Sequence, residues 1–560
     1  MKVLRWLWPL CVFGVAVASS AALDRNAFTF TDYKLNVRIE PEQQRLAARG
    51  KIALRNDSSL PQRNVVLQIS SSLGWRSIQV GGKPVQFVSQ TYTSDVDHTG
   101  SLSEAIVSLP EQVPPKAAVD LDVGFEGTIS LDATRLKRIG VPDDAARHSD
   151  WDQISPRFSA VRGVGYVTWY PIATEAANLS EGNGLFEVLA KWKTREKDAG
   201  MDLDLCVQQE SGSAPTIMAN AATLGLSGEA CIEYRFSPLG VTVPTFVTGA
   251  YAKLGNKMAE IHYLGDHRAA AESYVRAAET ALPFVATWFG EPRSAAEVLE
   301  LPDPGAAPFE AGRLLLTPFS TDQKFAELSL VHELTHAAFP SSRPWIYEGV
   351  AHLAQALWSE QQTGRQGALD YMGLHRSSIA DAERVQRSQA SQPLVTATDE
   401  EFYRSKAMFV WWMLRDMVGD SALKQALKAY RPEDDKDLSY TQKLLETAAK
   451  RDLGWFFDDW VYQDKGLPDF RMVSVYPRAL AAGGQVVTVA VENLGAAGAE
   501  TPITVRMQTG EVTKRLEVRG KSKTAIRIEV PSKPEEVLIN DGSVPESDMS
   551  NHTLKIEPTK

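Results

Sequence analysis

The chain has 560 residues, a formal net charge of −11 and a sequence pI near 5.5. Its hydrophobic content of 44% and charged content of 23% are ordinary for a folded, water-soluble protein, and its length is too great for one hydrophobic core, so about three domains are expected. The acidic balance argues against nucleic acid as a partner, because binding a phosphate backbone requires a basic face.

The first residues have the pattern of an export signal. Lys2 and Arg5 precede an apolar stretch over residues 6–18, and small residues at 16–22 offer cleavage sites. The stretch is short for a membrane span, and an uncleaved anchor is the alternative. We therefore expect a signal peptide over residues 1–22 and a periplasmic or secreted mature protein with no stable membrane span.

Residues 24–251 are expected to form an N-terminal β domain. Apolar and polar residues alternate in three stretches, over residues 33–39, 51–56 and 65–69. Regular short strands separated by turn signals favour a β-sandwich-like arrangement. The stretches 71–75 and 143–155 are interpreted as loops.

Two cysteines, Cys206 and Cys231, lie in this domain, and each is flanked by residues that alternate as in a strand. The two side chains could therefore meet across a sheet. An even pair in an oxidising compartment favours a disulfide, and two free buried thiols are the alternative. We predict a disulfide in the exported protein.

From residue 252 the apolar spacing changes to three and four residues, which is typical of helices. Helices are predicted over residues 268–289, 407–417, 421–430 and 440–451, with a strand over 314–317. Alternation returns after residue 470, at 486–491, 503–507, 513–518 and 525–530. The last part, 471–560, is therefore expected to be a C-terminal immunoglobulin-like β-sandwich, and the fold class is multidomain α+β.

A His-Glu-x-x-His motif lies inside an apolar run that begins at Phe325. On a helix, His332 and His336 are one turn apart on the same face and can bind one metal ion, while Glu333 lies beside it. Zinc suits this site because it takes nitrogen and oxygen ligands and leaves one position open in catalytic centres. We therefore predict one zinc ion per chain.

A second helix is expected to follow this motif, because Pro340 and Pro344 end one helix and begin the next. A tight turn between two antiparallel helices would bring Glu348 back toward the two histidines as the third ligand. His352 lies one turn after Glu348. It is either a hydrogen-bonding partner for a ligand or a surface histidine.

The segments H-E-L-T-H (residues 332–336) and W-I-Y-E-G-V-A (residues 345–351) resemble the gluzincin zinc metallopeptidases, in particular the aminopeptidase N family. The resemblance implies that the two histidines and Glu348 hold the zinc and that Glu333 is the general base. It also implies a thermolysin-like, α-rich catalytic domain over residues 252–470. The spacing from the second histidine to Glu348 is shorter than in the family, so we expect a divergent branch.

Two more residues receive roles from this resemblance alone. Tyr403, in Y-R-S-K-A-M, matches the tyrosine of the family's Y-E-K-G-A-M, which stabilises the transition state. Glu310, before the predicted strand, matches the glutamate of G-A-M-E-N, which binds the free α-amine of the substrate. The Asn of that motif is Ala311 here. A structural tyrosine and an ordinary edge-strand acid are the alternatives.

Together these features predict an exported zinc-dependent metallopeptidase, in the first place an aminopeptidase that releases N-terminal residues from peptides. In this scheme a water activated by zinc attacks the scissile carbonyl, after Glu333 has taken its proton. The alternatives are an endopeptidase or another hydrolase on the same scaffold, and a catalytically silent binding protein. A silent protein would have no need to keep Glu333.

Overall fold

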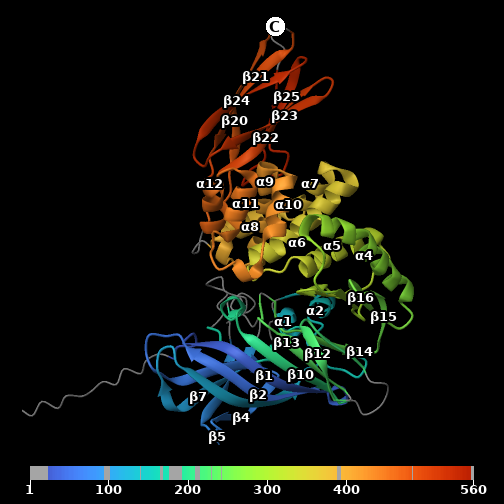
Figure 1. Cartoon of the computed structure of the whole chain (residues 1–560), viewed down its shortest axis with the longest axis vertical. Coiled ribbons are helices and arrows are strands. Elements are labelled where there is room, and N and C mark those ends of the chain that lie inside the picture. Colours follow the sequence, from blue (N-terminus) through green and yellow to red (C-terminus); the bar gives the residue numbers. More distant parts are fainter. Residues whose placement is uncertain are drawn as a thin grey trace, which may run out of the picture.

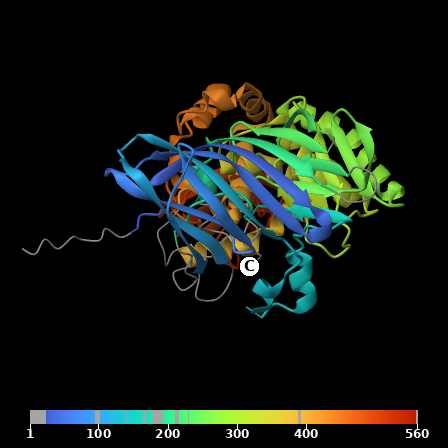
Figure 2. The same cartoon turned by 90° about the horizontal axis from the view of Figure 1, so that it is seen from below.

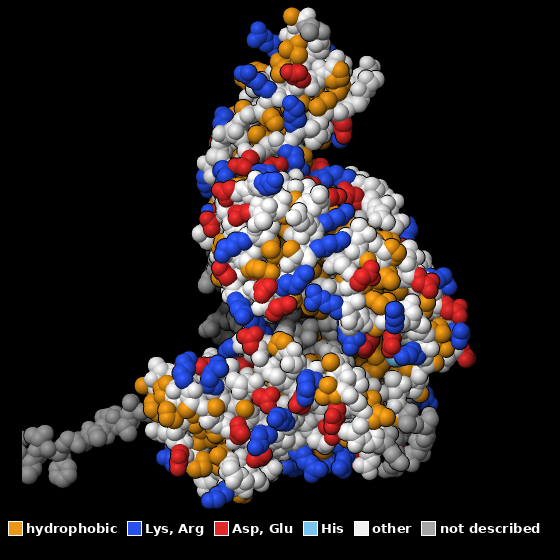
Figure 3. Space-filling model, viewed as in Figure 1, with side chains coloured by type: hydrophobic (Ala, Val, Ile, Leu, Met, Phe, Trp, Pro, Cys, Tyr) orange, Lys and Arg blue, Asp and Glu red, His pale blue; other side chains and the backbone are white. Residues whose placement is uncertain are grey.

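A computed structural model describes residues 23–93, 101–138, 140–163, 168–175, 192–208, 215–228, 230–240, 242–386, 392–481 and 483–556. The signal peptide predicted over residues 1–22 lies outside this part of the chain. The molecule is elongated, with N-terminal strands at one end, helices in the middle and the C-terminal strands at the other end (Figure 1). Acidic and basic side chains are intermixed on the face shown in Figure 3.

The N-terminal part is built on an eight-stranded sheet with the order β12-β13-β10-β1-β2-β8-β4-β5. Its strands are β1 (Phe28–Glu40), β2 (Arg45–Asn56), β4 (Leu73–Val80), β5 (Lys83–Pro84), β8 (Ala118–Thr128), β10 (Gly200–Val207), β12 (Ala222–Gly228) and β13 (Cys231–Phe236). A three-stranded sheet, β3-β7-β6, contains β3 (Gln62–Ser70), β6 (Phe87–Thr93) and β7 (Ser101–Val113). Tyr33, Leu35 and Val37 alternate into one core with buried residues of this second sheet, as the sequence pattern predicted.

Two stretches that were interpreted as loops are so only in part. Residues 71–72 form a turn, but 73–75 belong to β4, where Leu73 and Trp75 are buried in the core. The second contains α2 (Asp143–Ser149), which follows α1 (Thr134–Arg138). Acidic residues in the first turn of α2 and basic residues in its last turn stabilise the helix through its dipole. The loop prediction rested on the polar composition of this stretch and did not use these end charges. Both helices project to one side of the large sheet (Figure 2).

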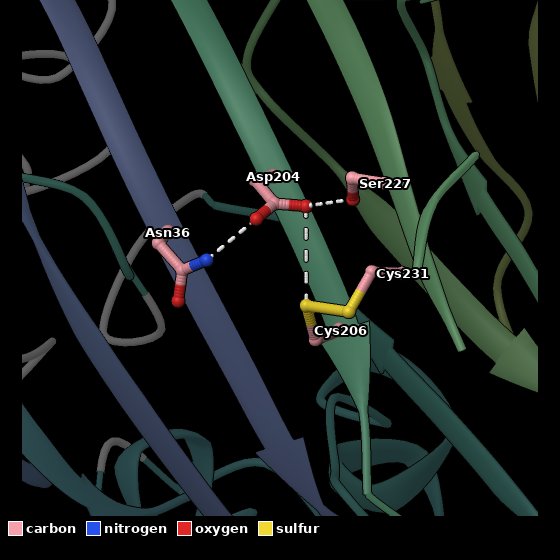
Figure 4. Close-up of a disulfide and its surroundings, with 5 residues drawn as sticks. All are labelled: Asn36, Asp204, Cys206, Ser227 and Cys231. Carbon is pink, nitrogen blue, oxygen red and sulfur yellow. Dashed lines mark hydrogen bonds between the residues drawn. A yellow bond between two sulfur atoms is a disulfide. The ribbon is translucent and has the colours of Figure 1, made fainter. Parts of the chain in front are cut away.

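The disulfide predicted from the sequence is present between Cys206 and Cys231. The two residues face each other in the antiparallel pair β10–β13 and close a segment of 25 residues (Figure 4). Asp204, two residues along the same strand, accepts a hydrogen bond from Asn36 on β1. The disulfide therefore links β10 to β13, and Asp204 links β10 to β1 on its other side.

A second β layer connects the N-terminal part to the helices. The three-stranded sheet β11-β14-β9 contains β9 (Phe158–Val161), β11 (Thr216–Ala219) and β14 (Phe246–Gly249). The five-stranded sheet β15-β16-β17-β19-β18 contains β15 (Tyr251–Asn256), β16 (Ala259–Leu264), β17 (Ala296–Glu300), β18 (Phe309–Ala311) and β19 (Leu314–Thr317). Phe158 of the first sheet and Leu316 of the second share a small hydrophobic core, so the two parts are packed together.

The helices cover the five-stranded sheet and continue to the C-terminal strands. They are α4 (Arg268–Phe289), α5 (Gln323–Ala338), α6 (Pro344–Thr363), α7 (Arg365–Gly373), α8 (Arg376–Gln386), α9 (Ala407–Val418), α10 (Asp420–Ala429), α11 (Tyr440–Ala449) and α12 (Gly454–Phe457). The bounds of α4 and β19 are those predicted from the sequence. Among the described residues, no helix is both long enough and apolar enough to span a membrane.

The C-terminal strands form two small antiparallel sheets, β20-β21-β24 and β23-β22-β25-β26. Their strands are β20 (Phe470–Ala479), β21 (Gln485–Asn493), β22 (Ala499–Met507), β23 (Glu511–Val518), β24 (Lys523–Val530), β25 (Pro534–Ile539) and β26 (Thr553–Lys555). Val487 and Ile503 belong to the same hydrophobic core as Phe456 and Trp460 of the helical part. The sandwich and the helices are therefore joined by a continuous apolar contact.

Candidate metal centre

The His-Glu-x-x-His motif lies on α5, a helix that is buried along most of its second half. The side chain of Asp322 caps the helix by accepting a hydrogen bond of 3.0 Å from the backbone N–H of Lys324. After a short turn, Pro344 occupies the first position of α6, where the missing N–H of proline has no cost. Helices α5 and α6 pack against each other and place Glu348 opposite His332 and His336.

The three predicted ligands converge on one point. The Nε2 atom of His332 lies 2.9 Å from Nε2 of His336 and 3.7 Å from Oε2 of Glu348. The Nε2 atom of His336 lies 3.8 Å from Oε1 of Glu348. Ligands about 2.0–2.2 Å from a tetrahedral zinc ion are separated by about 3.3–3.6 Å. The observed separations lie on either side of that range, by at most about 0.4 Å, so small movements of these side chains would give a zinc site.

Hydrogen bonds hold the ring of His332 so that its Nε2 atom faces His336 and Glu348. Gln355 donates from its amide nitrogen to the carbonyl of Leu328 at 3.0 Å, which turns its Oε1 toward His332. That oxygen accepts a hydrogen bond of 3.2 Å from Nδ1 of His332. Metal-binding histidines usually have such a partner, because it fixes the ring and its tautomer. The ring of His336 is instead stacked on Tyr347, with centroids 3.8 Å apart.

His352 joins the same network on its far side. Tyr371 donates its only proton to Oε1 of Gln355 at 2.6 Å, so its oxygen accepts from Nδ1 of His352 at 3.0 Å. Potential ligand atoms of His332, Glu348 and His352 all lie within 4.8 Å of one another. His352 is therefore connected to His332 through Tyr371 and Gln355, and it could itself reach a metal.

Glu333 is fully buried beside these residues. Neither of its carboxyl oxygens accepts a hydrogen bond within the described part of the chain. Burial raises the pKa of Glu333 well above its usual range, and the neighbouring Glu310 and Glu348 raise it further. A buried carboxyl group with free oxygens is placed to exchange a proton with a small molecule bound at the centre.

Arg404 is a cation next to the predicted ligands. It lies on a π-helical turn, Glu401–Lys406, which leads into α9. Its guanidinium group forms ion pairs with Glu310 and with Oε2 of Glu348, the latter at 3.2 Å, and lies 3.9 Å from Oε2 of Glu400. Burial alone would lower the pKa of Arg404, but these carboxylates outweigh burial and raise it, so Arg404 remains charged.

The other two predicted site residues lie at the same place. Oε2 of Glu310 is 3.3 Å from Nε2 of His332, and the hydroxyl group of Tyr403 donates to Glu400 at 3.3 Å. Glu310, Glu348, Tyr403 and Arg404 line one cavity of about 90 Å³. Lys193, from the N-terminal part, lines it too, so this cavity lies between the two parts of the molecule.

Sequence reasoning missed four residues of this site. Arg404 stands beside Tyr403, where the resembled motif has glutamate, and this reversal of charge was a usable signal. Gln355 is two helical turns after Glu348 on the same face of α6, so helical periodicity could have identified it. Tyr371 and Lys193 come from other elements, and no local pattern marks them.

Comparisons with known proteins assign neither a family nor a function to this chain. No protein-family model and no curated protein matches the sequence. Similar solved structures include the M1 zinc metallopeptidase from Deinococcus radiodurans and a point mutant of that enzyme, each with a TM-score of 0.43 and 16% sequence identity. The matches cover 76% of this chain and 91–92% of those chains. At this identity and TM-score the similarity assigns no chemistry, which rests on the site residues of this chain.

Proposed function

We propose that this protein is a zinc-dependent peptide hydrolase. The observation that carries the proposal is the convergence of two imidazole nitrogens and one carboxylate, 2.9–3.8 Å apart, beside the buried Glu333. Two histidines and one glutamate form a typical catalytic zinc set, because three protein ligands leave a position open. His332, His336 and Glu348 would hold the ion.

Bound zinc would supply Lewis acidity, which polarises a carbonyl group and makes a water molecule more acidic. Glu333 accepts the proton of the attacking water and delivers it to the nitrogen of the leaving group. Its carboxyl group is buried next to the proposed ligands, where it can reach a water molecule bound between them. Gln355 keeps the ring of His332 in one orientation during this exchange.

Tyr403 is the proposed donor to the oxyanion that develops on the scissile carbonyl. Its side chain is buried and lines the cavity next to Glu348. Its hydrogen bond to Glu400 is long, at 3.3 Å, and Glu400 is largely exposed, so the hydroxyl group can exchange this partner for a substrate oxygen.

Removal of N-terminal residues is the finer activity that the sequence resemblance implies. It requires a carboxylate for the α-ammonium group of the substrate, and the position of Glu310 beside His332 supports this role. Cleavage of internal peptide bonds is the second candidate. It is favoured by the ion pair between Glu310 and Arg404, which occupies that carboxylate.

Export to the periplasm or the outside of the cell is proposed with this activity. Two observations support it: the basic and apolar pattern of residues 1–18 and the disulfide between Cys206 and Cys231. Disulfides persist in oxidising compartments.

The experiment that tests the function combines metal analysis with hydrolysis. Elemental analysis should find one zinc ion per chain in the wild type and in Glu333→Gln, and none in His336→Ala. Glu333→Gln should lower the turnover of a panel of unblocked and blocked peptides by about a hundredfold or more. Full zinc occupancy in His336→Ala, or wild-type turnover in Glu333→Gln, would contradict the proposal. Zinc binding without hydrolysis of any peptide would indicate a binding protein.

A further inference from the structure

Glu310 is already neutralised by a partner inside the protein. One of its oxygens, Oε2, is bonded to the guanidinium group of Arg404 and lies 3.3 Å from Nε2 of His332. The side chain of Glu310 is 22% exposed and that of Arg404 is 29% exposed, so water screens the pair only in part. An α-ammonium group that approached Glu310 would have to displace Arg404 or share a carboxylate with it.

Within the described part of the chain, Arg404 has few carboxylate partners to choose from. It lies on a π-helical turn whose next residues are anchored: Ser405 is hydrogen-bonded to His375, and Lys406 is buried in two ion pairs. Its remaining carboxylate contacts are Glu348, which is a predicted metal ligand, and Glu400, 3.9 Å away and 70% exposed. Glu310 is thus the partner best able to keep Arg404 once Glu348 binds a cation.

The charges of the described residues on the cavity wall also leave no strong site for a substrate ammonium group. Three carboxylates, Glu310, Glu348 and Glu400, line the cavity together with two basic residues, Lys193 and Arg404. With Glu348 engaged by a divalent cation and Glu310 by Arg404, the exposed Glu400 is the one carboxylate left to attract a positive group among the described residues that line the cavity. Exposed carboxylates bind ammonium groups weakly because water competes.

We propose that Arg404 determines the substrate class of this site: by neutralising Glu310 it adapts the cavity to peptide bonds that have no free α-amine next to them. Such substrates are internal peptide bonds and N-acylated peptides. The guanidinium group has five N–H donors, and those not used by Glu310 are available to a backbone carbonyl of the bound peptide. This inference rests on the proposed peptidase function.

The test measures binding separately from hydrolysis. Two peptides of identical sequence, one with a free N-terminus and one N-acetylated, are titrated by calorimetry into the zinc-loaded Glu333→Gln protein. We expect the acetylated peptide to bind at least as tightly as the free one. Adding Arg404→Gln releases Glu310, and the ratio of the two dissociation constants should shift toward the free peptide by about ten- to a hundredfold, the usual range for a charge-assisted hydrogen bond.

Two further variants identify the carboxylate responsible. Adding Glu310→Gln to the Arg404→Gln protein should return the ratio to its starting value. Glu310→Gln in the presence of Arg404 should change the ratio less than threefold, and this variant decides the question if Arg404→Gln does not fold or lacks zinc. Arg415→Gln is the matched control, because Arg415 lies on α9 and pairs with Glu360 and Asp420 instead. Zinc content is measured in every variant.

Three outcomes would overturn the inference. The first is a tenfold or greater preference for the free peptide while Arg404 is present. The second is an unchanged ratio in a folded, zinc-loaded Arg404→Gln protein, and the third is no binding of either peptide. Hydrolysis by the wild type tests the proposed function independently: if it cleaves neither peptide, that function fails, whereas the binding ratio still tests the role of Arg404.

Discussion

Lys406 is a buried cation whose removal should destabilise the helical part of the molecule. It is 2% exposed, and its Nζ atom lies 2.5 Å from Oε1 of Glu383 and 3.0 Å from Oδ1 of Asp464. The side chains of Glu383 and Asp464 are only 4% and 6% exposed, and the rings of Phe402 and Trp460 lie against the ammonium group. Lys406 therefore compensates two carboxylates that water cannot reach.

The expected magnitude follows from this burial. Removing one partner of a buried ion pair costs about 3–5 kcal/mol, because the opposite charge remains buried without compensation. For a cooperative unit of about 200 residues, 1 kcal/mol corresponds to about 2–4 °C in Tm, so Lys406→Met should lower the Tm of the helical part by about 6–20 °C.

Differential scanning calorimetry of the full chain is the assay, with metal content measured in parallel. Lys428→Met is the control, since Lys428 is an exposed lysine of α10 and its replacement should change stability by less than about 0.5 kcal/mol. A triple variant, Lys406→Met with Glu383→Gln and Asp464→Asn, should recover much of the loss, because no charge is left buried. A Tm for Lys406→Met within 2 °C of the control would refute the reasoning.

Three other predictions concern separate parts of the chain. Gln355→Met should raise the zinc dissociation constant about ten- to a hundredfold, measured by competition with a chelator, because the ring of His332 loses its acceptor; an unchanged constant would count against this role. Mass spectrometry of unreduced peptides from exported protein should find the Cys206–Cys231 disulfide, and two freely alkylated thiols would contradict this. Replacing both cysteines with serine should lower the free energy of unfolding by up to about 3.5 kcal/mol, for a closed segment of 25 residues. Burial lowers the pKa of His262 to about 4, so the unfolded state takes up a proton first as the pH falls from about 6.5 to 4, and stability is lost over that range. Urea unfolding at several pH values should show a weaker loss of stability in His262→Gln than in the wild type.

Local patterns determined most of the secondary structure. A strand or helix with one buried face repeats its apolar residues at a fixed period, and this period is visible in the sequence. For that reason the predicted strand over 33–39 falls within β1, and the predicted helix over 268–289 coincides with α4. The same reasoning failed over residues 143–149, because α2 is a short polar helix whose signal lies in its end charges and not in apolar spacing.

The proposed ligand set also comes from the sequence. His332, His336 and Glu348 lie within 17 positions on two consecutive helices, and one turn between those helices brings them together. The disulfide partners are similarly constrained, since they are the two cysteines of one sheet. In both cases the residue types themselves restrict the chemistry, and little tertiary information is needed.

Only the tertiary structure decided what surrounds these ligands. Glu310 and Arg404 are 94 positions apart, and Lys193 approaches from the N-terminal part of the molecule. Whether a carboxylate near the ligands is free or neutralised depends on which distant cation packs against it, and no periodicity in a single segment encodes that contact. The sequence by itself indicated the residues proposed to hold a metal, whereas the charge around them was decided by the packing of a π-helical turn against an edge strand.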